Sequence, residues 1–150
     1  MTAAMELPIE AERLIPHRKP MRVIDRLLEA TDCAGTAEAW VAADHALVDR
    51  DGRLDRTAFP EMIAQAYAAV QGHAYRQAGK PIVPGFLVGI RRCDVYGEAL
   101  AGDRLTVRVH MVKQFAGFAL VDGAVILRND TIAEASIKVW VPPAEPQEPE

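Results

Sequence analysis

Two side chains that are suited to proton transfer, His45 and Glu61, lie 16 residues apart in the middle of the sequence. Neutral imidazole is available near pH 7, so His45 is a candidate general base. Glu61 is flanked by the apolar residues Phe59 and Met62, and burial among them would keep its carboxyl group protonated and make it a general acid. Gln65 lies one helical turn beyond Glu61, where it would orient that carboxyl group or satisfy a buried backbone group.

The other three histidines are interpreted as structural or surface residues. His17 precedes a predicted strand within Pro16-His17-Arg18, and we expect it to be packed and hydrogen-bonded. His73 falls on the predicted helix and His110 on the polar face of a predicted strand. We expect both to contact solvent or a subunit partner.

One long helix is predicted over residues 58–78. This segment is rich in alanine, glutamine and methionine, which mostly favour helix, while Gly79 is placed to end the helix and Pro81 to prevent its continuation. Its apolar residues recur at spacings of three and four and are mostly small. Such a stripe can lie close against a sheet.

Extended segments surround this helix on both sides. Alternation of apolar and polar residues is clearest at 105–111, and turn signals occur at Gly102-Asp103 and Asn129-Asp130. We expect the last strands to form an antiparallel meander, with residues 86–96 as the strand before it. The predicted strands cover residues 22–28, 35–42, 86–96, 105–111, 118–127 and 133–141. The fold class is therefore α+β, with a single antiparallel sheet curled around one central helix.

Composition limits the domain count and the partners. The 150 residues, half of them apolar, suit one domain over residues 1–141, and the prolines and acids of 142–150 predict a disordered tail. A formal charge of −4 argues against nucleic acid and anionic membranes as partners.

The cysteines and the lack of a targeting signal indicate the compartment. Cys33 and Cys93 are far apart in the sequence, so we expect reduced, buried thiols. Without an export signal or a long apolar run, we expect a soluble, cytoplasmic protein.

Four blocks of the sequence, in order, are similar to one known family. Residues 14–26 read LIPHRKPMRVIDR, residues 61–66 read EMIAQA, residues 86–90 read FLVGI, and residues 102–105 read GDRL. These blocks resemble the hotdog-fold 3-hydroxyacyl-carrier-protein dehydratases of fatty-acid synthesis. The resemblance implies a single hotdog fold, a dimer, and active sites built from both subunits.

The active-site loop departs from the family pattern. Members carry His-Phe-Pro-Gly and a Pro-Gly before the helix, whereas residues 44–54 read DHALVDRDGRL and keep only the histidine. In this respect the chain looks more like the divergent dehydratases of aryl polyene pathways. The loss of these glycines and prolines affects the expected substrate more than the expected reaction. That reaction is dehydration of a 3-hydroxyacyl thioester to the trans-2-enoyl thioester.

The resemblance implies roles for particular residues. His45 would be the base and Glu61 the acid, with Gln65 in support. Thr57, Ala58 and Phe59 are candidates to polarise the thioester carbonyl, because a helix start presents unpaired N–H groups.

The resemblance also implies the partners. The substrate would be carried on the phosphopantetheine arm of an acyl carrier protein, and no further cofactor and no metal is implied. Because carrier proteins are acidic, basic residues should ring the tunnel mouth, with Arg91 and Arg92 as candidates after Gly89. We expect a homodimer or a heterodimer with a related hotdog subunit, and neither a nucleic acid nor a membrane as partner.

Two other functions stay open at this point. A hotdog acyl-CoA thioesterase could use the same helix carboxylate as base or nucleophile, although the opening Pro-His-Arg block argues against it. A catalytically silent acyl-binding or carrier-binding subunit is compatible with the missing glycines and prolines of residues 44–54.

Overall fold

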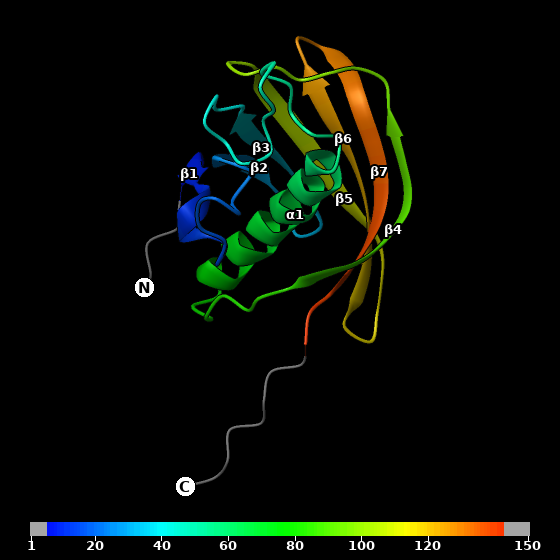
Figure 1. The fold of residues 1–150 in the computed structure, drawn as a ribbon. Coiled ribbons are helices and arrows are strands. Elements are labelled where there is room, and N and C mark those ends of the chain that lie inside the picture. Colours follow the sequence, from blue (N-terminus) through cyan, green and yellow to red (C-terminus); the bar gives the residue numbers. More distant parts are fainter. Residues whose placement is uncertain (1–5, 143–150) are drawn as a thin grey trace, which may run out of the picture.

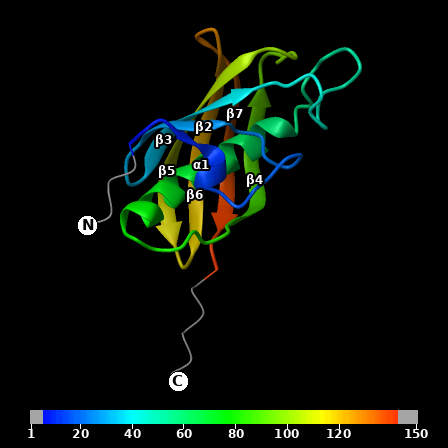
Figure 2. The same ribbon diagram turned by 90° about the vertical axis from the view of Figure 1, so that its left-hand side faces the viewer.

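The computed structural model describes residues 6–142 as one helix lying across one face of an antiparallel sheet (Figures 1 and 2). The helix α1 spans Ala58–Gln77, and a single 3-10 turn, η1, spans Ala11–Arg13. This architecture confirms the predicted α+β class. The predicted tail lies outside the described residues, apart from its first residue, Pro142. No helix in the described part of the chain is long and apolar enough to cross a membrane.

The sheet contains seven strands in the order β1-β2-β3-β5-β6-β7-β4, and every neighbouring pair is antiparallel. Their bounds are Ile9–Glu10 for β1, Arg26–Ala30 for β2, Ala34–Trp40 for β3, Phe86–Val95 for β4, Arg104–Phe115 for β5, Phe118–Leu127 for β6 and Asp130–Trp140 for β7.

Most element boundaries follow the local signals in the sequence. The helix ends one residue before the predicted end, and Gly79 adopts a φ of +70° there. Gly102 and Asn129 have φ values of 94° and 69° in the turns before β5 and β7. The strand predicted to start at residue 22 begins only at Arg26, because the Val23 N–H is bonded to a helix side chain, Gln65, rather than to a strand.

Strand β4 is the main departure from the expected topology. It was predicted to join β5 through the turn at Gly102, but β5 already pairs with β3 on one side and β6 on the other. The chain therefore crosses over, and β4 pairs with β7 at the far edge (Figure 1). This edge strand exposes three apolar side chains, Phe86, Val88 and Ile90, to about half of their area, at 51%, 50% and 52%.

The core lies between α1 and the sheet and depends on small residues at the contact. Ala66 and Ala69 of α1 are fully buried. A Cβ atom at Gly72 would collide with the backbone carbonyl of Leu14, and one at Gly123 of β6 would lie 2.5 Å from Ile63 Cγ2. These missing side chains let the helix approach the sheet and the N-terminal segment closely, as the small-residue stripe predicted.

The exposure of the two cysteines differs from the prediction. Both were predicted to be buried, but both are exposed, and neither forms a disulfide. Cys33 lies in the turn between β2 and β3, and Cys93 lies on the edge strand β4.

Candidate active site

A groove between α1 and the start of β4 contains Glu61 at a polar end. It encloses about 60 Å³ in the single chain. Its walls are mainly apolar, because Ala64, Ala68 and Leu87 line it together with three valines. The full lining comprises His17, Glu61, Ala64, Gln65, Tyr67, Ala68, Gln71, Tyr75, Val83, Gly85, Phe86, Leu87, Val139 and Val141. An apolar pocket with a few converging polar groups is the usual form of a small-molecule site.

Gln65 holds the Glu61 carboxyl group in place. Its side chain is almost completely buried, and its Nε2 donates hydrogen bonds to Glu61 Oε1 at 2.8 Å and to the Met21 carbonyl at 2.9 Å. Its Oε1 accepts a bond from the Val23 N–H at 2.8 Å. Gln65 therefore both orients Glu61 and satisfies buried backbone groups, the two alternatives suggested by its position in the sequence.

His17 is the second ionisable group beside Glu61. Its Nε2 lies 3.9 Å from Glu61 Oε1, and the two side chains are 26% and 32% exposed. Its Nδ1 is buried and has no hydrogen-bond partner among the described residues. The expected hydrogen-bonded structural histidine is therefore not observed, and sequence reasoning missed that His17 reaches this pocket.

His45 lies in the loop before α1 and does not line the groove that contains Glu61. Its Nδ1 accepts a hydrogen bond from the Leu47 N–H at 3.0 Å, and its buried Nε2 has no partner in the described part of the chain. In neutral imidazole only one nitrogen carries the proton, so this bond places the proton on Nε2. Nε2 is then a donor, and a base role for His45 requires the Leu47 bond to break.

The predicted carbonyl-polarising donors at the helix start are already paired. The N–H groups of Thr57 and Ala58 bond to the side chain and the carbonyl of Asp55, and that of Phe59 bonds to the Arg56 carbonyl. Hydrogen bonds from the Thr57 hydroxyl and backbone lower the pKa of Asp55. The turn before the helix thus satisfies the donors that the sequence suggested would be unpaired.

The predicted mouth residues Gly89, Arg91 and Arg92 are on β4 but do not line the groove. Both arginines are exposed and line a shallow depression with Asp122 and Glu134. Arg92 Nε donates to Asp94 Oδ2, and this hydrogen bond raises the pKa of Arg92. Acidic neighbours therefore offset much of the positive charge at this position.

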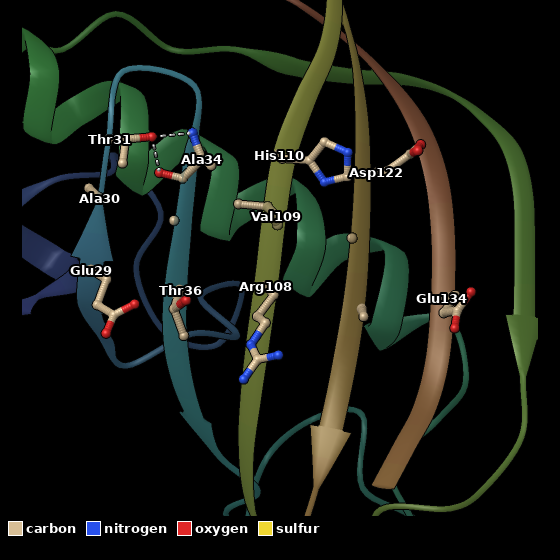
Figure 3. Close-up of a pocket in the computed structure, with 13 residues that line it drawn as sticks. Glu29, Ala30, Thr31, Ala34, Thr36, Arg108, Val109, His110, Asp122 and Glu134 are labelled. Atoms are coloured by element: carbon tan, nitrogen blue, oxygen red, sulfur yellow. Dashed lines mark hydrogen bonds between the residues drawn. The ribbon is translucent and has the colours of Figure 1, made fainter. Parts of the chain in front are cut away.

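A larger but more open depression, of about 600 Å³, lies on the face of the sheet opposite the helix. Figure 3 shows α1 behind the sheet, with Arg108, His110 and Asp122 among the labelled side chains. His110 and Asp122 are cross-strand neighbours on β5 and β6. The Glu61 groove is the better candidate active site, because it is more enclosed and combines an apolar wall with two adjacent proton-transfer groups.

Within residues 6–142, no group of three or more His, Cys, Asp or Glu side chains could hold a metal ion. Among the residues that line the groove, Tyr67 is 4% exposed, and desolvation raises its pKa to about 12.

Comparisons with known proteins agree with this fold. A family model described as ApeP dehydratase, of the ApeP-like family, matches residues 9–149. The dehydratase heterocomplex ApeI:P from Xenorhabdus doucetiae contains a similar chain, with a TM-score of 0.84 and 19% identity over 91% of this chain and 93% of that chain. A search of curated proteins found no match.

More distant structures share the fold alone. A hypothetical thioesterase from Streptococcus pneumoniae TIGR4, solved with coenzyme A, has a TM-score of 0.60 and 12% identity over 77% of this chain and 84% of that chain. The uncharacterized protein PH1136 from Pyrococcus horikoshii has a TM-score of 0.65 and 14% identity over 92% and 96%. The single central helix and antiparallel sheet are those of the hotdog fold. From the family match over most of its length, the chain belongs to the ApeP-like dehydratase family.

Proposed function

We propose that this protein dehydrates a 3-hydroxyacyl thioester, carried on an acyl carrier protein, to the trans-2-enoyl thioester. One observation carries the proposal: Glu61 is held by the buried Gln65 at the polar end of an apolar groove, in a chain of a dehydratase family. The reaction belongs to fatty-acid-like or polyene synthesis and takes place in the cytoplasm.

Glu61 supplies the proton for the departing hydroxyl group in this proposal. Gln65 fixes the carboxyl group through Oε1, so the other carboxyl oxygen is available to face the substrate. His45 stays a predicted participant. In one chain it lies outside the groove, so it would act on a substrate beside Glu61 only from a second subunit.

The groove also supports a thioester with an acyl chain. From Glu61, the lining residues Ala64, Ala68, Gln71 and Tyr75 follow at helical spacings of three or four, so the groove runs along α1. Its volume in one chain is enough for only a few water molecules, so a bound acyl chain requires the groove to widen or a second subunit to extend it.

A related hotdog subunit is the partner that we propose, besides the acyl carrier protein. The similar chain from Xenorhabdus doucetiae comes from a dehydratase heterocomplex. Here the edge strand β4 borders the Glu61 groove through Phe86 and Leu87 and carries further exposed apolar residues. An additional subunit at this edge would cover those residues and close the groove.

The test is a turnover assay with the purified protein, alone and together with any hotdog subunit that copurifies with it. A 3-hydroxyacyl thioester on a carrier protein or on pantetheine is added, and the conjugated enoyl thioester is followed by absorbance while free thiol is titrated. We expect enoyl product without thiol release. Thiol release would instead indicate a thioesterase, and tight binding without turnover in either form would indicate a silent acyl-binding subunit.

A further inference from the structure

We propose that His17, and not a histidine from another segment, is the catalytic base that works with Glu61 of the same chain. This inference rests on the proposed dehydration and assigns a second residue to the same site. His17 and Glu61 line one groove, with His17 Nε2 3.9 Å from Glu61 Oε1. Both side chains are partly exposed, so both are open to a substrate in the groove.

The hydrogen bonding of the two histidines favours His17. The buried Nδ1 of His17 accepts no hydrogen bond from the described residues, so no contact there prevents it from carrying the ring proton. The tautomer with the proton on the buried Nδ1 leaves Nε2 as an acceptor facing Glu61 and the groove. His45 differs, because the Leu47 N–H occupies its Nδ1 and leaves Nε2 as the donor.

The segment that carries His17 is tied to the same side chain that positions Glu61. Gln65 binds the Met21 carbonyl and the Val23 N–H, a few residues after His17, and with the same amide group binds Glu61. Arg18 Nη1 also donates to the carbonyls of Ile15 and His17 at 2.9 Å, which secures the turn. One buried glutamine therefore holds both the Glu61 carboxyl group and the chain segment that follows His17, within a single subunit.

Their proximity suits an elimination across adjacent carbons. His17 Nε2 takes the proton from the carbon next to the thioester carbonyl, and that C–H electron pair becomes the new double bond. The bond from the next carbon to its hydroxyl group breaks, and the proton from Glu61 joins the leaving oxygen to form water. The resulting imidazolium and carboxylate then return to their starting forms by proton transfer over the short gap between them, directly after a small side-chain shift or through a water molecule.

The decisive experiment is steady-state turnover of the complete protein in His17→Ala and His17→Gln, with His110→Ala as the matched control. His110 lies on the opposite face of the sheet and lines no part of the groove. We expect kcat to fall by roughly a hundredfold or more in both His17 variants, with binding of an enoyl product analogue retained, and to change little in His110→Ala. Added imidazole should restore part of the turnover of His17→Ala, since it can occupy the vacated space and accept the proton.

Retention of more than a third of wild-type kcat by either folded His17 variant would overturn the assignment. If His17→Ala fails to fold by thermal melting, His17→Gln, which keeps much of the side-chain volume, decides the question. Wild-type protein that forms no enoyl product would instead refute the proposed function, so the two failures are distinguishable. A hundredfold loss in His45→Ala with full turnover in His17→Gln would assign the base to the loop histidine and also overturn this proposal.

Discussion

At the scale of single residues, the chemistry of the groove depends on a carboxyl group that is held but not enclosed. Glu61 has one oxygen bonded to Gln65, and 32% of its side chain is exposed. The apolar neighbours seen in the sequence, Phe59 and Met62, are buried in the core, so the groove rather than the core receives the carboxyl group. A bound acyl chain would cover the part of this side chain that is exposed in the single chain.

Glu61→Gln is expected to reduce dehydration by a hundredfold or more while the protein still binds a product analogue. The amide keeps the shape of the side chain and an oxygen that accepts the Gln65 bond, but it cannot deliver a proton. Turnover and analogue binding, by absorbance and calorimetry, check the prediction. Near-normal turnover would remove Glu61 from the mechanism and leave it a structural residue of α1.

The buried hydroxyl group of Tyr67 is expected to make the free energy of unfolding fall at high pH. Burial raises its pKa to about 12 from 10.0, so the folded state holds this proton more tightly than the unfolded state. The contribution of this proton to the free energy of unfolding, roughly 1–3 kcal/mol, is complete below pH 10 and is lost as the pH rises to 12. Urea unfolding over this range should show a smaller decline in Tyr67→Phe than in the wild type. Parallel declines in the two proteins would contradict the assignment to Tyr67.

At the scale of elements, the position of α1 depends on close contacts at glycines. Gly72 of α1 lies against the Leu14 carbonyl, and Gly123 of β6 lies against Ile63 of α1. The Leu14 contact ties the helix to the N-terminal segment that carries His17. Close packing at these points therefore supports the site as well as the core.

Gly72→Ala is expected to destabilise the protein by about 1–3 kcal/mol or more, although alanine is the better helix former. The added methyl group would overlap the backbone of Leu14, which cannot move as freely as a side chain. Gly89→Ala is the matched control, because its Cβ would meet only Lys138 Cβ, at an ordinary 3.8 Å. Chemical denaturation measures both variants, and equal stability of Gly72→Ala and wild type would show that the helix has room to shift.

At the scale of the whole molecule, the sheet has an unprotected edge. Strand β4 pairs with β7 on one side only, and it carries Phe86, Val88 and Ile90 in partly exposed positions. Free edges with apolar side chains favour strand pairing with another chain. The groove that contains Glu61 opens beside the same strand, so assembly and substrate binding are expected to be linked.

We expect the protein to be at least dimeric at micromolar concentration, and Val88→Lys to weaken that association by placing a charge on the edge. Val112→Lys is the control, since Val112 of β5 is similarly exposed, at 56%, but belongs to an interior strand of the sheet. Sedimentation velocity of the three proteins, with thermal melting to confirm folding, gives the result. If the wild-type protein is a monomer at this concentration in the absence of a second hotdog subunit, the prediction of self-association is wrong. Assembly with a related subunit would then be the only form of association left.

The sequence by itself determined the features that depend on neighbours along the chain. Residues 58–78 carried helix formers and were followed by a terminating glycine, Gly79, and the observed helix is Ala58–Gln77. Glu61 and Gln65 are four residues apart, so helical geometry alone brought them together. Alternation and turn residues located β5, β6 and β7, and the α+β class followed from the order of these elements.

Only the tertiary structure decided which distant segments meet. The placement of β4 beside β7 followed from the occupation of both sides of β5, which no local pattern reports. His17 reached Glu61 because Gln65 binds backbone groups of Met21 and Val23, 44 and 42 residues away in the chain. Local periodicity describes which face of an element is apolar, but not which segment packs on that face, so the sequence singled out His45 while the fold brought His17 to the groove.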